Sequence, residues 1–317
     1  MRSQKKPSRT NRFNNRHIRP HRAHKLHGAF IALFFVVVCP IIRLRSHAEV
    51  ETPITKKFEI SIAEVRSVAL ICYGLPRSLH FTINSMRTNM ISPLQSVGIT
   101  VDIFVHTFHH RRPISNRRSL ERDVKLDNDE WKLLQPVAVD VESVDSVLND
   151  QKFLLSELKR YGDAWHDGFR SLERYLLALH SAKHATRLVQ MRNKYYDGAI
   201  LTRGDLLFLD PIDVDLFVKA VSQQSVVVPV WQSWSGLNDR FMYGAVDEIF
   251  RYAYRIDNVS SFCLRTGEPF HSERFLRWFC TSAVKQTTPR CTKQRAARVR
   301  ADGRVQHENF TSDVQPF

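Results

Sequence analysis

From residue 67 onward, short continuous apolar runs alternate with longer amphipathic stretches. Runs such as SVALICY (67–73) and SVVVPV (225–230) are rich in β-branched residues, which is typical of strands buried on both faces of a sheet. The pattern predicts strands at 67–73, 100–108, 136–142, 198–202 and 225–230, and helices from about residue 76, within 151–196 and over 271–284. Strands that alternate with helices predict an α/β domain with a mostly parallel sheet flanked by helices, which binds ligands at the carboxyl ends of the strands.

A separate apolar segment, GAFIALFFVVVCPII (28–42), follows a tail of 27 residues with nine Lys/Arg and no acid. It is short for a membrane span, which usually needs about 17–25 residues, so a cleaved signal peptide and a buried helix are alternatives. The long basic tail favours an uncleaved signal anchor with a cytosolic N-terminus. We expect a type II protein of the Golgi or endoplasmic reticulum membrane with a luminal body. Its expected parts are a tail (1–27), an anchor (28–44), a stem (45–65), a catalytic domain (66–285) and a basic C-terminal tail (286–317).

The formal net charge of +15 arises from the two flanks of the chain. Residues 49–284 contain 29 basic and 29 acidic residues, so the body is neutral and a nucleic-acid partner is not expected. Asn258 and Asn309 begin glycosylation sequons, which suits a lumen. The cysteines after residue 66 lack zinc-like spacing; in a lumen they would form two disulfides, although Cys72, in an apolar run, is better interpreted as a buried free thiol.

The segment GAILTRGDLLFLDPID places Arg203 and Asp205 at the end of a predicted buried strand. A carboxylate there would hold Mn²⁺ or Mg²⁺ bridging a nucleotide diphosphate, and Arg203 would add fixed positive charge. The alternative is a strand-terminal turn with an Arg–Asp salt bridge. Asp210 and Asp213 are expected to cap the next helix. The chain has no GxGxxG or GxxxxGK[ST] motif, which argues against dinucleotide oxidoreductases and P-loop enzymes.

Two strand or helix ends add candidates. Gly74, Arg77 and Ser78 follow the first strand, where backbone N–H groups and an arginine suit a phosphate. Glu273 lies at the start of the late helix, where it is a catalytic or acceptor-binding candidate; Ser272 as a cap, with Glu273 in the first turn, is the structural alternative.

A polar and aromatic segment, WQSWSGLNDRFMYG (231–244), follows the last predicted strand. Trp231 and Trp234 have faces that suit sugars, and Asn238 and Arg240 offer polar groups for a sugar or an acceptor. Asp239 would bind hydroxyls or serve as a general base. A surface loop with aromatic anchors is the alternative.

Taken in order, YGLPRS, SVGITVDIFVHTF, YDGAILTRGDLLFLDPID, GLNDRFMYG, HSERFLRWF and RVRADG resemble a group of glycosyltransferase-like proteins of the GT-A class, over about residues 66–304. That class usually carries an Asp-x-Asp metal motif, and here the matching segment is Arg203-Gly204-Asp205. The resemblance implies that Asp205 faces the donor diphosphate, Asp239 and Arg240 the sugar or acceptor, and Glu273 the acceptor.

The expected function is therefore transfer of a sugar from a nucleotide-sugar to a glycan or glycoprotein hydroxyl. Two alternatives stay open. A luminal sulfotransferase would share the anchor and the sheet and would place its phosphosulfate near Arg77 and Ser78. A membrane-anchored lectin-like or inactive transferase domain would bind ligand without catalysis.

Overall fold

The computed structural model describes residues 64–75, 77–116, 119–283 and 288–313, all within one compact unit, Lys56–Phe317. The expected anchor at 28–44 and the tail and most of the stem around it lie outside the described residues. Among the residues that are described, no helix is both long enough and apolar enough to cross a membrane.

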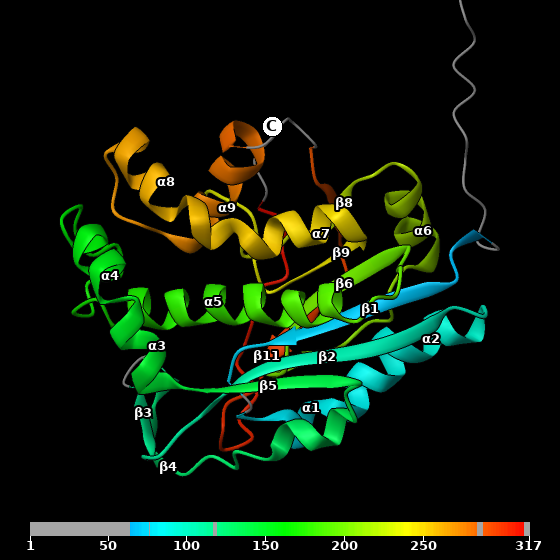
Figure 1. Ribbon diagram of the computed structural model, residues 1–317, viewed down its shortest axis with the longest axis horizontal. Helices are drawn as coiled ribbons and strands as arrows, with labels where there is room; N and C mark the ends of the chain where they lie inside the picture. Colours follow the sequence, from blue (N-terminus) through cyan, green and yellow to red (C-terminus); the bar gives the residue numbers. More distant parts are fainter. Residues whose placement is uncertain (1–63, 76, 117–118, 284–287, 314–317) are drawn as a thin grey trace, which may run out of the picture. The chain divides into compact units, whose positions relative to one another are not determined.

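The predicted α/β class is confirmed: a seven-stranded sheet with helices on both faces forms the centre of the structure (Figure 1). Its strand order is β10-β8-β9-β6-β1-β2-β5, and β9 alone runs against the others. The strands of this sheet are β1 (Ser67–Tyr73), β2 (Thr100–His109), β5 (Ala138–Ser143), β6 (Gly198–Arg203), β8 (Val226–Pro229), β9 (Phe241–Ala245) and β10 (Arg290–Thr292).

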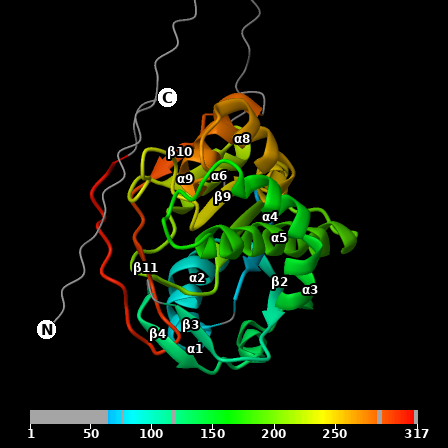
Figure 2. The ribbon, with the colours of Figure 1, turned by 90° about the vertical axis from the view of Figure 1, so that its left-hand side faces the viewer.

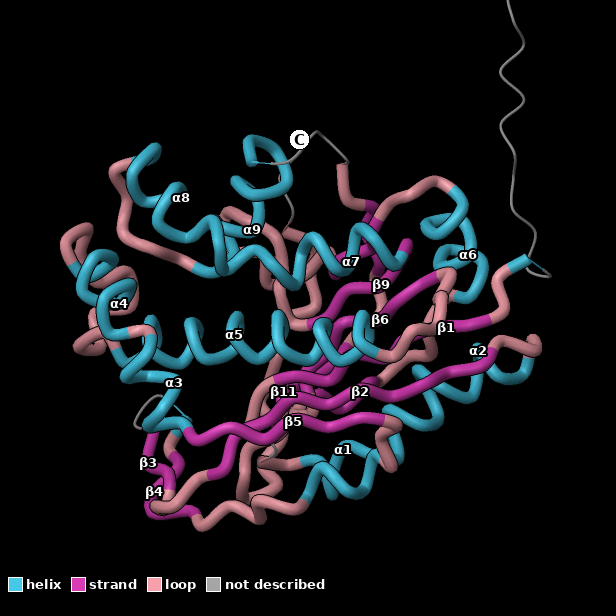
Figure 3. Tube along the Cα trace, viewed as in Figure 1, coloured by secondary structure: helices cyan, strands magenta, loops and turns pink. Residues whose placement is uncertain are grey.

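The apolar runs form the strands because both faces of the sheet are covered, as Figure 3 shows. Residues 68–73 of β1 are all buried. One face packs on α1, α2 and α6, and the other on α5, α7 and α9. These helices are α1 (Leu79–Met86), α2 (Ser92–Ser96), α5 (Arg170–Met191), α6 (Val214–Ser222), α7 (Val246–Ala253) and α9 (Ser272–Trp278).

Shorter elements complete the described fold. Two small antiparallel pairs join β3 to β4 and β7 to β11. Beyond the sheet, α4 and α8 pack with α5 and α9 in a third apolar cluster. These elements are β3 (Ile114–Asn116), β4 (Glu121–Val124), β7 (Leu206–Phe208), β11 (Ala296–Arg298), α3 (Val144–Asp150), α4 (Lys152–Lys159) and α8 (Val259–Thr266), with single turns at Arg87–Ile91, Glu130–Leu134, Tyr254–Asn258 and Phe279–Ala283.

The C-terminal segment, expected to be a solvated basic tail, is part of the fold over its described residues. β10 pairs with β8 and β11 with β7, because backbone pairing and the buried Ala296 and Ala297 outweigh the basic composition. After β11 the chain, red in Figure 2, reaches the β3–β4 hairpin, where Arg304 donates to Ser119 O, and then returns to bridge Trp231 through Ser312.

Two local predictions are resolved by the structure. Asp213 caps α6 as expected, with its carboxylate accepting the N–H of Leu216 at 2.9 Å, whereas Asp210, also expected to cap this helix, binds Arg295 instead. All four cysteines in the described part of the chain are free thiols, and Cys72 is buried in β1.

Candidate functional site

The order in which the chain adds strands to the sheet reverses at β1 and β6. The chain passes from β1 outward to β2 and β5, then returns to place β6 on the other side of β1. In open α/β sheets such a switch point opens a crevice at the carboxyl ends of the two strands. Arg77 follows β1, Arg203 is the last residue of β6 and Asp205 lies in the turn after it, so these predicted residues meet at the crevice.

Asp205 joins the two sides of the switch point. Its Oδ2 accepts from Arg77 Nη2 at 2.6 Å and from Arg203 Nη2 at 2.7 Å, and its Oδ1 accepts from Arg203 Nε at 2.8 Å. Asp205 is buried, whereas the side chain of Arg203 is 30% exposed. The Arg–Asp pair is thus present, and Arg77, 128 positions away in sequence, is its third member.

The electrostatics keep Asp205 and Arg203 charged. Burial by itself would raise the pKa of Asp205, but the charges of Arg203 and Arg77 outweigh it and hold that pKa well below its usual range. Burial would lower the pKa of Arg203, and the charge of Asp205 more than reverses this effect. Both carboxylate oxygens accept guanidinium N–H groups, so Asp205 orients two arginines.

A further arginine, Arg300, lies near Arg77 and Asp205. Burial, and then the charges of Arg77 and Arg298, lower the pKa of Arg300 to about 10. Arg77 also lies 3.6 Å from Glu121, between Nη1 and Oε2. Like charges that depress one another's pKa in a half-buried place are relieved by a bound anion, so this end of the sheet suits a phosphate or diphosphate.

The loop before β9 docks against the start of α9. A Cβ on Gly236 would lie 2.0 Å from the backbone C and O of Glu273, so only glycine allows this approach. Leu237 N donates to Glu273 O at 3.0 Å. The contact brings Asp239 and Glu273, the two predicted catalytic carboxylates, into electrostatic range of each other.

Glu273 is a carboxyl group that binds its proton tightly. Burial, and then the negative charge of Asp239, raise its pKa to about 8. Its Oε2 accepts from Ser272 Oγ and lies 3.3 Å from His271 Nδ1. The N-cap of α9 is His271 rather than the expected Ser272, which is why the Ser272 hydroxyl reaches the carboxylate instead of a backbone N–H.

The remaining residues of this loop divide into buried and exposed ones. Trp231 is fully buried, donates from Nε1 to Gln294 O at 2.9 Å and has the Arg240 guanidinium 5.1 Å from its ring centre. Arg240 forms an ion pair with Glu308 at 3.1 Å, and Asn238 Nδ2 donates to Trp231 O at 2.6 Å. Trp234 is 61% exposed, so it is the tryptophan of this loop whose ring lies at the surface.

Gly74 and Ser78, predicted to bind phosphate, are tied to neighbouring elements. Gly74 has a φ of +98° and donates from its N–H to Ser181 Oγ of α5 at 2.8 Å. The buried hydroxyl of Ser78 donates to Val299 O at 2.9 Å. These bonds fix the turn that carries Arg77, although helix α1 begins at Leu79 rather than near residue 76.

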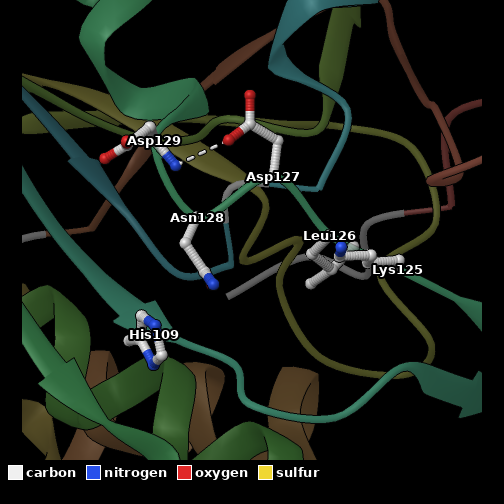
Figure 4. A pocket seen from close by; sticks show the side chains of 6 residues that line it. All are labelled: His109, Lys125, Leu126, Asp127, Asn128 and Asp129. Carbon is white, nitrogen blue, oxygen red and sulfur yellow. Dashed lines mark hydrogen bonds between the residues drawn. The ribbon is translucent and has the colours of Figure 1, made fainter.

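A pocket of about 620 Å³ opens next to the end of β2 (Figure 4). Figure 4 shows His109 on one side and the loop 125–129 on the other, where Asp129 N donates to Asp127 Oδ1 at 2.9 Å. None of the predicted site residues lines it.

Sequence reasoning missed a second cluster of polar side chains. His106 of β2, Glu142 of β5, and His180 and His184 of α5 bring one potential ligand atom each to within 4.8 Å of one another. The signal in the sequence was His-x₃-His within a helical stretch, which puts both imidazoles on one face of a helix. Of the two sequon asparagines, Asn309 is exposed and Asn258 half-buried.

No protein-family model matches this chain, and a search of curated proteins finds no match.

Proposed function

We propose that the protein is a glycosyltransferase that moves a sugar from a nucleotide-sugar to a hydroxyl of a glycan or glycoprotein. The observation that carries this proposal is the Arg77–Asp205–Arg203 group across the β1–β6 switch point. Two fixed guanidinium groups at the carboxyl ends of parallel strands match the two negative phosphates of a nucleoside diphosphate. The fold supports a GT-A-like architecture through its mostly parallel sheet, whose one reversed strand, β9, lies next to β6.

In this proposal arginines supply the counter-charge that a metal would otherwise supply. Arg203 is partly exposed, so its N–H groups that do not bind Asp205 can donate to a phosphate while Asp205 keeps the guanidinium charged and oriented. Arg300 adds a further cation in the same region. Arginine is suited to this role because its planar donors bind phosphate oxygens in pairs.

The transfer itself needs a base and a leaving group. The acceptor oxygen bonds to the anomeric carbon, the bond from that carbon to the diphosphate breaks, and the acceptor proton passes to a carboxylate. Glu273 holds a proton near neutral pH, so we assign the base to Asp239 and the acceptor side to Glu273. Trp234 would stack on a sugar ring from the exposed side of the loop.

We further propose the topology that the sequence predicts: a signal anchor at 28–44, a type II orientation and a luminal body in the Golgi or endoplasmic reticulum. The basic N-terminal tail and the two sequons support it. Protease protection of the body in sealed microsomes tests it; digestion of the body in intact vesicles would contradict it.

The function is tested by ligand-induced thermal stabilisation of the full-length chain. UDP, GDP, CMP and adenosine 3′,5′-bisphosphate are compared, each with and without Mn²⁺, because a ligand of the native state raises the unfolding midpoint. A rise with UDP, GDP or CMP supports the transferase and identifies its donor class. A rise only with adenosine bisphosphate would replace it by sulfate transfer, and no rise with any nucleotide would contradict the proposal.

A further inference from the structure

Three histidines and a glutamate from three elements converge beside the candidate active site. Glu142 Oε2 lies 2.8 Å from His106 Nε2 and 3.7 Å from His184 Nδ1, and it also contacts His180 Nε2. His106 is buried, and the other three side chains are between 16% and 30% exposed. A tetrahedral ion with bonds of about 2.0–2.1 Å needs ligand atoms roughly 3.3 Å apart, which falls within this range of separations.

Hydrogen-bond counting around Ser181 fixes the tautomer of His106. Ser181 Oγ lies 2.9 Å from the carbonyl oxygen of His106, which only accepts, so the single hydroxyl hydrogen points there. The same Oγ accepts the N–H of Gly74 at 2.8 Å. His106 Nδ1, 2.8 Å from this oxygen, must therefore donate, which leaves Nε2 of the neutral ring without a hydrogen.

The result is a lone pair that faces a carboxylate. His106 Nε2 and Glu142 Oε2 are 2.8 Å apart, and two acceptors at that distance repel unless a cation lies between them. A hydrogen bond that orients one nitrogen and leaves the other bare is what metal-binding histidines have.

We propose that His106, Glu142, His180 and His184 bind one transition-metal ion of the zinc class. Three imidazole nitrogens and one carboxylate suit Zn²⁺, Co²⁺ or Ni²⁺, whereas Mg²⁺ and Ca²⁺ prefer oxygen. Four protein ligands describe a closed, structural site. Asp140 Oδ2 lies 3.7 Å from His184 and 3.8 Å from His106 and adds negative charge to this side of the cluster.

Metal binding requires one local change. His184 Nε2 lies 3.4 Å from Arg187 Nη1 at the surface. When Nδ1 of His184 binds the ion, Nε2 carries the hydrogen, and Arg187 must move away into solvent. His180 and His184 also line a cavity of about 350 Å³, which gives the ion a way in.

The site would stabilise the neighbouring crevice. It joins α5 to β2 and β5, and Ser181, between His180 and Ala182 in α5, holds the N–H of Gly74 just before the turn to Arg77. His106 pairs in register with Tyr73, which in turn pairs with Arg203. This inference does not depend on the chemistry proposed for Arg203 and Asp205.

The test is Zn²⁺ binding by the metal-free full-length chain, measured by competition with a chromophoric chelator. Wild type is expected to bind one equivalent, and His184→Ala and Glu142→Gln to bind at least about 10-fold more weakly. His307→Ala, at an exposed histidine outside the cluster, is the matched control and should bind like wild type. Equal affinity in wild type and both cluster variants would overturn the proposal.

A spectrum of the wild-type chain with Co²⁺ covers the case in which a variant fails to fold. Strong visible d–d bands without a near-ultraviolet thiolate band are expected for nitrogen and oxygen ligands in a tetrahedron. Weak octahedral bands, a thiolate band from a cysteine site, or no bound Co²⁺ would each contradict the assignment.

Discussion

Replacing Asp205 by asparagine is expected to destabilise the fold by about 3 kcal/mol, because the change leaves two half-buried arginines without their carboxylate. Removing one partner of a buried pair costs about 3–5 kcal/mol. The lower end applies here because the side chain of Arg203 is 30% and that of Arg77 11% exposed, so water solvates part of each charge. At roughly 2–4 °C per kcal/mol, the midpoint should fall by about 10 °C.

The pH dependence of the unfolding free energy is a second, independent test of this prediction. The pKa of Asp205 is lowered in the folded state, so its stabilisation is present above the pKa of the unfolded state, about 3.9, and is lost as pH falls below it. The difference in unfolding free energy between wild type and Asp205→Asn should therefore shrink below about pH 4, by up to about 1.4 kcal/mol per pH unit.

The assay is urea unfolding followed by circular dichroism at pH 7 and at pH 3. Asp150→Asn, at an exposed helix end, is the matched control and should stay within about 0.5 kcal/mol of wild type. In a double-mutant cycle, Arg203→Met and Asp205→Asn should couple by about 1–3 kcal/mol. A loss below 1 kcal/mol for Asp205→Asn, or a difference independent of pH, would refute the reasoning.

Three further predictions concern the loop before β9 and the helix it contacts. Glu273→Gln should stabilise the chain at pH 9 by up to about 5 kcal/mol and leave its stability unchanged near pH 4. The reason is the raised pKa of Glu273, about 8, which makes the ionised side chain destabilising as pH rises. Urea unfolding at both pH values measures this difference, and equal effects at both would contradict it. Gly236→Ala should lower the free energy of unfolding by at least about 1–3 kcal/mol, because the new Cβ clashes with the Glu273 backbone. Gly267→Ala should cost less, since its Cβ meets no atom within 4 Å although the φ of Gly267 is +69°. A lower thermal midpoint for Gly267→Ala than for Gly236→Ala would contradict the docking of this loop. Trp231→Ala should cost about 3–5 kcal/mol and Trp234→Ala less than about 1 kcal/mol, since the first is buried and the second exposed; similar thermal midpoints for the two would argue against this assignment.

The apolar runs predict β1, β2, β6 and β8 because burial on both faces leaves a composition that is readable without any partner. They also predict β5, although it is an edge strand with no fully buried residue. The sequence predicts a loop where β9 forms, since FMYGA begins directly after Asp239 and Arg240 and is paired on both sides only in the folded sheet. β10 and β11 were hidden by their basic neighbours, because three-residue strands depend on the edges that they join.

The candidate site was predictable where it is local in sequence. The Arg203–Asp205 pair follows from a spacing of two residues at a strand end. Arg77 is predicted to bind the donor phosphate as well, but its contact with Asp205 could not be predicted, because only the strand order places the ends of β1 and β6 side by side. The histidine cluster combines a visible helical pair, His180 and His184, with two residues that only the β2–β5 pairing brings beneath it.

The central claim is that Arg77 and Arg203 bind a nucleoside diphosphate without help from a metal at Asp205. Isothermal titration of UDP and GDP into the full-length chain, in buffer without added divalent metal, tests it most directly. Binding of one nucleotide by wild type and by Arg265→Met, an exposed arginine of α8, with at least about 10-fold weaker binding by Arg77→Met and Arg203→Met, is the predicted result. Binding that appears only with Mn²⁺ and is unaffected by either arginine variant would contradict it.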